Sequence, residues 1–268
     1  MKKSVAVIGY GALGKILVDV ILEKLSDDYV IQGVWTRSIV KHRPTLKEKG
    51  VPAYSTIDEL LADSTDYVIE IAGVQVVRAY AEQILESGKD LIVTSVGALA
   101  DEAFYASLQE TARSKKQKVY VASGAVGGFD IFQSIALMGQ AQGKIHTQKA
   151  PRSLEGAPHL EGRDLSKESA ELIFDGTAEE AITAFPKNIN VAVASALASV
   201  GVEEMHTQIE SVPGLEANIH EITVENNSVL ASLKVTSQPD ADNPKSSVIT
   251  AWSVAALLQN LASPIEFY

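Results

Sequence analysis

The chain has 268 residues, enough for two domains of ordinary size, each with its own core. Hydrophobic residues make up 46% and charged residues 21%, as in ordinary globular proteins, which argues against disorder. A formal net charge of −11 argues against nucleic acid or an anionic membrane as a partner, and no apolar run reaches the ~20 residues of a membrane span. The absence of cysteine excludes disulfides and thiolate chemistry, and we expect a cytoplasmic protein.

The first candidate site is a glycine turn near the start of the chain. An apolar run from residue 4 leads into Gly9, Gly11 and Gly14, and residues 12–25 then show helical periodicity. A strand, a glycine turn and a helix in this order are typical of a dinucleotide-binding site. The first glycine permits the tight turn, the second lets backbone approach a pyrophosphate, and the third allows close packing of helix on strand. The predicted cofactor-binding residues of this turn are Gly9, Gly11, Ala12, Leu13 and Gly14.

The end of the second predicted strand, Val30–Trp35, bears on the choice of cofactor. An acidic residue often follows this strand and binds the adenosine ribose, but here the chain continues with Thr36 and Arg37. Thr36 can hydrogen-bond a ribose or a phosphate oxygen, and Arg37 can pair with a 2′-phosphate. The alternative is that Arg37 is a solvated loop residue. The sequence therefore predicts that the protein accepts NADP as a cofactor, and it leaves open that NAD is accepted as well.

Strands and helices alternate over the rest of the first half of the chain. Helices are predicted at residues 57–61, 76–86 and 102–115, and strands at 67–71, 90–94 and 118–121. This alternation is typical of a parallel, Rossmann-type sheet. Ala72 follows the third strand at the ligand-binding edge of that sheet and is a further candidate cofactor contact. His42 lies beside Lys41 and Arg43, a stretch we expect to be a solvated basic loop.

The pattern changes at about Ser123. A small-residue loop, Ser-Gly-Ala-Val-Gly-Gly at 123–128, opens a predicted helix at 129–139. Strands are then predicted at 144–149, 172–174, 204–211, 217–225 and 229–236, and helices at 178–185 and 188–200. This predicts an α/β protein with an N-terminal Rossmann dinucleotide-binding domain, residues 1–123, and a C-terminal α+β catalytic and oligomerisation domain, residues 124–246. The last helix, residues 247–262, is expected to pack back on the first domain.

His220 stands out among the five histidines because of its neighbours. It alternates with Ile219, so His220 and Asn218 point to one face of a predicted strand. Catalysis and an ordinary strand position are both compatible with this spacing. The chain has no metal-ligand spacing of His, Asp and Glu, so we predict no metal site.

Two further groups of polar residues are candidates for ligand binding. Asn188 is placed to cap the helix that follows it, whereas Asn190 lies within the first turn, where its carboxamide could reach a nicotinamide amide or a carboxylate. Basic residues on predicted loops could bind a dicarboxylate or could be ordinary surface groups; they are Lys149, Arg152, Lys187 and Lys245.

These motifs together resemble the L-aspartate dehydrogenase family. They are the loop at 123–128, Lys-Ala-Pro-Arg-Ser-Leu at 149–154, Phe-Pro-Lys-Asn-Ile-Asn-Val-Ala at 185–192, Asn-Ile-His at 218–220 and Asn-Pro-Lys-Ser at 243–246. The resemblance covers nearly the whole chain, from Gly9 to the last helix. It implies that His220 is the active-site histidine and that Ala125 and Asn190 contact the cofactor.

The resemblance also implies an activity. L-Aspartate and NAD or NADP would give iminoaspartate, which water converts to oxaloacetate and ammonia, in a homodimer or larger homo-oligomer linked to NAD biosynthesis. Lys149, Lys187, Asn218 and Lys245 are candidate substrate-binding residues. One alternative is another two-domain reductase of the dihydrodipicolinate reductase type, although the basic, histidine-rich motif expected of it is missing. The other is a protein that senses NAD or NADP without turnover.

Overall fold

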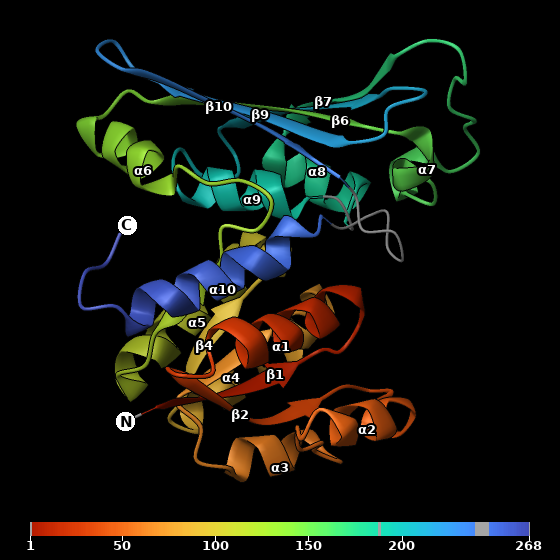
Figure 1. Cartoon of the computed structure of the whole chain (residues 1–268). Coiled ribbons are helices and arrows are strands. Elements are labelled where there is room, and N and C mark those ends of the chain that lie inside the picture. Colours follow the sequence, from red (N-terminus) through yellow and green to blue (C-terminus); the bar gives the residue numbers. More distant parts are fainter. Residues whose placement is uncertain (1, 187–188, 239–246, 268) are drawn as a thin grey trace. The chain divides into compact units, whose positions relative to one another are not determined.

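The computed structural model describes residues 2–186, 189–238 and 247–267, which form two compact units (Figure 1). The first unit contains residues 2–122 together with Thr250–Phe267, and the second contains residues 123–249. None of the helices in this described part of the chain combines the length and apolarity that a bilayer crossing requires.

The first unit is built on a five-stranded sheet with the order β2-β1-β3-β4-β5. All neighbouring strands in this sheet are parallel. The strands are β1 (Lys3–Ile8), β2 (Tyr29–Trp35), β3 (Tyr67–Glu70), β4 (Asp90–Val93) and β5 (Val119–Val121). The predicted Rossmann-type sheet is therefore confirmed, and the carboxyl ends of all five strands meet at one edge.

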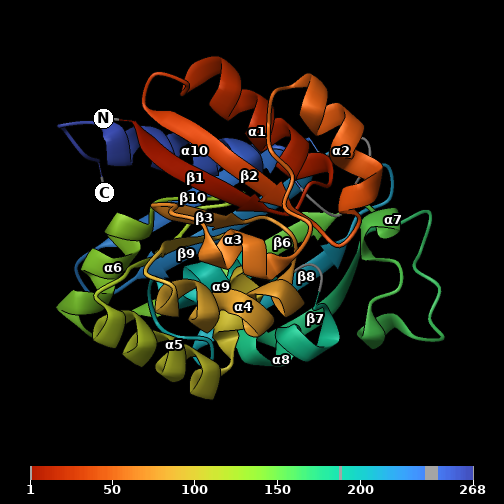
Figure 2. The same ribbon diagram turned by 90° about the horizontal axis from the view of Figure 1, so that it is seen from below.

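Helices cover both faces of this sheet. They are α1 (Ala12–Lys24), α2 (Ile39–Glu48), α3 (Ile57–Ala62), α4 (Val74–Glu86), η1 (Val96–Ala100), α5 (Glu102–Lys115) and α10 (Ile249–Ala262). Two of these helices begin at a side-chain cap: Thr56 accepts a hydrogen bond from the Glu59 amide, and Asp101 accepts one from the Phe104 amide. Figure 2 shows α1 and α10 on one face of the sheet and α4 and α5 on the other.

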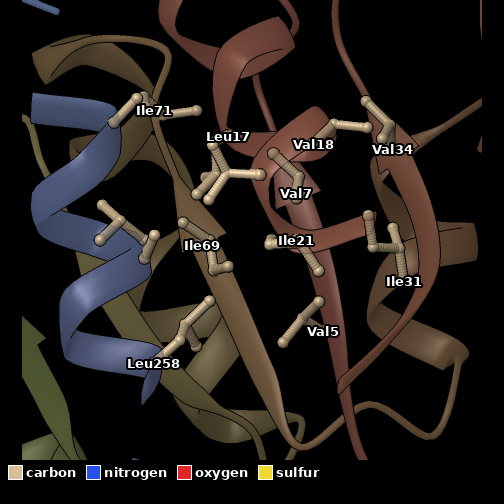
Figure 3. Close-up of a cluster of buried hydrophobic side chains, with 14 of the residues drawn as sticks. Val5, Val7, Leu17, Val18, Ile21, Ile31, Val34, Ile69, Ile71 and Leu258 are labelled. Carbon is tan, nitrogen blue, oxygen red and sulfur yellow. The ribbon is translucent and has the colours of Figure 1, made fainter. Parts of the chain in front are cut away.

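The core of the first unit lies between β1, β3, α1 and α10 (Figure 3). Val5, Val7 and Ile69 of the strands lie in one cluster with Leu17 of α1, and all four side chains are fully buried. Leu258 of α10 joins the same cluster, and its carbonyl oxygen accepts a 2.7 Å hydrogen bond from a tyrosine hydroxyl of β2. The last helix of the chain is therefore part of the hydrophobic core of the first unit.

The expectation of a loop around His42 is wrong, although its basic neighbours Lys41 and Arg43 are exposed as expected. Residues 39–48 form α2, with Pro44 inside the helix. Pro44 lacks the N–H of a regular helical hydrogen bond. The buried side chains of Ile39 and Leu46 hold the helix against the core and offset that loss. His42 is half-buried, and its ring meets the edge of the Tyr10 ring at a centroid distance of 5.3 Å.

The second unit contains a mixed five-stranded sheet with the order β10-β9-β6-β8-β7. The pair β6 and β8 is parallel, and the other pairs are antiparallel. The strands are β6 (Gln142–Lys149), β7 (Glu171–Thr177), β8 (Met205–Ser211), β9 (Asn218–Glu225) and β10 (Leu230–Ser237). The predicted α+β class of this half is confirmed.

Helices of the second unit cover one face of its sheet, as Figure 1 shows. They are α6 (Phe129–Met138), α7 (Pro151–Leu154), η2 (Pro158–Leu160), α8 (Ala178–Ala184) and α9 (Asn190–Leu197). The predicted strand at 144–149 is confirmed, because Lys149 is the last residue of β6. The predicted loop beyond it is wrong at residues 151–154, where Pro151 begins the short helix α7 and its fixed φ suits the first helical position.

Candidate functional site

The glycine turn of the first unit is shaped by close contacts between backbone segments. Gly9 has φ +110°, and a Cβ atom built on it would lie 2.6 Å from the carbonyl oxygen of Ile71. A Cβ on Gly14 would lie 2.3 Å from the carbonyl oxygen of Gly9. Both positions therefore require glycine, and together they fix the start of α1 beside the carboxyl ends of β1 and β3.

Gly11 is different, because it faces open space. A Cβ built on it would meet no atom of the described chain within 4 Å. Gly11 caps α1 and has no side chain, so the first amides of the helix receive no hydrogen bond from their cap residue. These amides and the helix dipole suit an anion, and the cradle fits the pyrophosphate of a dinucleotide.

The end of β2 lies directly beside this turn. The amide of Gly9 donates a 2.8 Å hydrogen bond to the carbonyl oxygen of Trp35. Thr36, half-buried, and Arg37, exposed, follow at once. Ala72 is also exposed, next to the segment that Gly9 contacts. The structure thus brings together all of the first-unit residues that the sequence predicts to contact a cofactor.

The second unit buries a polar cluster on the helix-covered face of its sheet. Lys149 and Thr147 lie on β6, Asn218 and His220 on β9, and Ser211 on β8. All five side chains are at most 6% exposed. The predicted alternation of Asn218 and His220 with Ile219 is present, because the first two are buried while Ile219 is half-buried on the opposite face.

His220 and Thr147 are direct partners across two antiparallel strands. The β6–β9 register places them opposite each other, and Thr147 Oγ1 lies 3.0 Å from His220 Nδ1. Burial lowers the pKa of His220 to about 3, and the positive charge of Lys149 adds to the effect. His220 is therefore a neutral imidazole at neutral pH.

Lys149 is buried at the end of β6. Burial lowers the pKa of its ammonium group to about 8. A buried cation of this kind is suited to an anionic group such as a carboxylate. Nearby Ser211, aligned with Lys149 in the β6–β8 register, has a buried hydroxyl with no hydrogen-bond partner among the described residues. A polar ligand bound here would supply a hydrogen-bond partner for this hydroxyl.

The remaining predicted residues are distributed as follows. Ala125 is buried in the loop that leads to α6, and Asn190 is the half-buried first residue of α9. Lys187 and Lys245 lie outside the described residues, as does Asn188. Arg152 lies in α7.

Sequence reasoning missed two residues. Thr147 could not be paired with His220, because the register between β6 and β9 is not visible in the sequence. Glu70 was missed although a signal exists: it is an acidic residue at the end of an apolar strand, directly before Ile-Ala-Gly. In the structure Glu70 is 1% exposed and binds the backbone of the neighbouring loops.

The environment of His220 generates the first prediction. In the protein without ligands, we expect the His220 ring to remain neutral from pH 8 down to about pH 4, as measured by nitrogen chemical shifts in NMR spectra. Lys149→Met removes the second cause of the low pKa and should raise the pKa of His220, while burial keeps that pKa below its ordinary value of about 6.5. Titration of His220 near pH 6.5 in the wild type would contradict the described burial and charge.

Comparison with known proteins gives matches over both units. The family described as "Aspartate dehydrogenase, C-terminal" matches residues 130–261, and the family described as "Homoserine dehydrogenase, NAD binding domain" matches residues 9–122. An L-aspartate dehydrogenase of Methanosarcina barkeri is 37% identical, with 98% of each chain covered. That of Methanospirillum hungatei is 34% identical, with 97% of each chain covered.

A solved structure is similar to the chain over its full length. The aspartate dehydrogenase of Thermotoga maritima matches with a TM-score of 0.77 and 28% identity, and 100% of each chain is covered. Sequence similarity above 30% over nearly the whole of two relatives, and the matched families, agree with this structural likeness. The chain belongs to the L-aspartate dehydrogenase family.

Proposed function

We propose that the protein oxidises L-aspartate with NAD or NADP, giving iminoaspartate, which water converts to oxaloacetate and ammonia. One observation carries this proposal: a buried cation, Lys149, and a neutral imidazole, His220, lie on the same face of one sheet. An amino acid with two carboxylates needs a cation to bind it and a base to remove a proton from its ammonium group. Membership of the family and the dinucleotide cradle support the same reaction.

His220 is proposed as the general base. The substrate ammonium must lose a proton before a hydride can leave Cα, and a neutral imidazole can accept that proton. If Nδ1–H donates to Thr147 Oγ1, the 3.0 Å contact leaves Nε2 as the basic nitrogen. Thr147 then acts as a positioning residue, because it selects the tautomer and holds the ring.

Lys149 is proposed to bind a substrate carboxylate and to couple binding to basicity. The positive charge of Lys149 is one cause of the low pKa of His220. A bound carboxylate brings negative charge next to Lys149, which offsets that repulsion and raises the pKa of His220 toward its ordinary range. The base is therefore weak in the empty site and becomes stronger when the dicarboxylate is bound.

The glycine turn is proposed to hold the dinucleotide. Bound there, NAD or NADP accepts the hydride that leaves Cα. The backbone of the turn and the first turn of α1 bind the pyrophosphate, and Thr36 and Arg37 bind the adenosine ribose or its phosphate. From the second unit, Ala125 and Asn190 are proposed as further cofactor contacts, and Asn218 as a substrate contact beside Lys149. Lys187 and Lys245 are kept as candidate substrate ligands from the sequence.

The cellular setting is also proposed. A cytoplasmic homodimer or larger homo-oligomer fits the resemblance to the family, and the absence of cysteine suits a reducing compartment. Iminoaspartate released by the enzyme would feed NAD biosynthesis.

A kinetic experiment tests the proposed reaction. Wild-type protein should reduce NAD or NADP when L-aspartate is added, as measured by absorbance of the reduced nicotinamide, and should turn over homoserine far more slowly. His220→Ala should lower kcat for aspartate about 10²–10⁴-fold, because a general base is lost. Direct titration should show unchanged dinucleotide affinity in this variant.

The matched control is another histidine of the same sheet. His146→Ala removes a half-buried ring of β6 that contacts Glu210 at 3.2 Å, on the face opposite Thr147. Its kcat should stay within about twofold of the wild type. A His220→Ala enzyme that keeps more than about half of the wild-type kcat would remove His220 from the mechanism.

The end of β2 generates a prediction about cofactor choice. We expect the wild type to use NADP at least comparably to NAD, because no carboxylate follows β2 to repel a 2′-phosphate. Thr36→Asp combined with Arg37→Ala should shift the ratio of kcat/KM values toward NAD by about ten- to a hundredfold, since a charge-assisted pair contributes roughly 1.5–3 kcal/mol. Arg43→Ala on α2, whose guanidinium contacts Ser55, is the control for loss of a positive charge. Strict NAD dependence that the double variant leaves unchanged would show that Arg37 plays no part.

A further inference from the structure

Glu70, the last residue of β3, is a buried carboxylate in the first unit. Its Oε1 atom accepts hydrogen bonds from the amides of Ala72 at 2.8 Å and Gly73 at 2.7 Å, and from the hydroxyl of Ser95 at 2.8 Å. Its Oε2 atom accepts from the amides of Ser95 at 3.1 Å and Thr94 at 3.4 Å. None of the ion pairs found within the described residues involves Glu70.

These contacts suit an acceptor. The amides of Ala72, Gly73, Thr94 and Ser95 can only donate, and the oxygens of Glu70 accept from them. The pKa of Glu70 is raised on balance, because burial outweighs the opposing effect of the hydrogen bonds from Gly73, Ala72 and Ser95. A buried charge without an opposite charge is costly, so folding stability alone does not explain its presence.

The contacts also identify what Glu70 holds in place. Ala72 and Gly73 join β3 to α4, and Thr94 and Ser95 join β4 to η1. Both segments lie at the carboxyl edge of neighbouring parallel strands. Glu70 thus ties the loop that follows it directly to Thr94 and Ser95, which lie 24 and 25 residues further along the chain.

The loop at 71–73 is in turn part of the dinucleotide cradle. Its Ile71 amide donates to the Ile8 carbonyl oxygen at 2.9 Å, and its Ile71 carbonyl oxygen is the atom that forbids a Cβ on Gly9. Helix α1 follows β1 on one face of the sheet, whereas α4 follows β3 on the other (Figure 2). The edge between β1 and β3 is therefore the topological switch point, where ligands of such sheets bind.

We propose that Glu70 is a positioning residue for the dinucleotide, a carboxylate clamp that fixes the backbone at Ala72–Gly73 and Thr94–Ser95 in the conformation the cofactor requires. The proposal rests on the dinucleotide binding in the proposed function, and does not depend on aspartate being the substrate.

Glu70→Gln tests the clamp with little change in shape. The amide oxygen can replace one carboxylate oxygen, but the amide NH₂ cannot accept hydrogen bonds. The hydrogen bonds from one of the two loops are therefore lost. We expect the Kd values of both oxidised and reduced cofactor, measured by titration of the purified protein, to rise about tenfold or more. The KM for cofactor should rise with them, while kcat at saturating cofactor and the KM for aspartate stay within about threefold. Ser95→Ala removes the hydroxyl donor alone and should raise the same Kd values about threefold.

Asp66→Asn is the matched control. Asp66 directly precedes β3, at the opposite end of this strand from Glu70, and binds Ser4 of the neighbouring strand β1. Asp66 Oδ2 accepts hydrogen bonds from the Ser4 amide at 2.7 Å and the Ser4 hydroxyl at 2.8 Å. This variant should lower the midpoint of thermal unfolding and leave cofactor Kd unchanged. Unchanged affinity in both folded Glu70→Gln and Ser95→Ala, or an equal loss in Asp66→Asn, would overturn the proposal. A wild type that binds neither NAD nor NADP would instead refute the proposed function.

Discussion

The first unit depends on two close approaches of backbone to backbone, which share Gly9. Gly14 packs against the carbonyl oxygen of Gly9, and Gly9 packs against the carbonyl oxygen of Ile71, at separations that exclude a Cβ atom. This stack aligns the N-terminus of α1 with the carboxyl ends of β1 and β3, where the partial positive charge of the helix can serve an anion. The Glu70 carboxylate continues the same chain of contacts to the loop after β4. Glycine is required in the cradle where two backbone segments approach too closely for a Cβ atom. Glu70 is the buried acceptor for the amides of the loops after β3 and β4.

The sheet of the second unit has both apolar and polar residues on its buried face. The buried face of its sheet is apolar at Ile145 and Ile222, where the helices need a core, and polar further along the same strands, at Lys149 and His220. Burial lowers the pKa values of both of these groups, and the charge of the lysine lowers that of the histidine further. A face that carries this cost in stability suits a ligand whose negative charge compensates it.

The sequence was sufficient where local chemistry decides the structure. The glycine spacing at 9–14 and the alternation of strands and helices predict the Rossmann-type unit, and alternation along β9 predicts that Asn218 and His220 share a face. Prediction failed where distant contacts decide. Helix α2 forms despite Pro44 because Ile39 and Leu46 are buried by the core. Strand register determines the burial of Lys149, its alignment with Ser211 and the contact of Thr147 with His220. The donors to Glu70 could not be predicted because Thr94 and Ser95 lie far from it along the chain.

We expect the buried cluster around Lys149 and His220 to bind a dicarboxylate and to gain a proton on binding. Calorimetric titration with succinate, which lacks the substrate amine, measures this directly when repeated near pH 8 in buffers of different ionisation enthalpy. Because the pKa of Lys149 is about 8 in the empty site and rises beside a bound carboxylate, binding should take up a fraction of a proton, and Lys149→Met should abolish the uptake. Failure of succinate to bind, or binding with no proton uptake in the wild type, would show that Lys149 does not bind a carboxylate in this cluster.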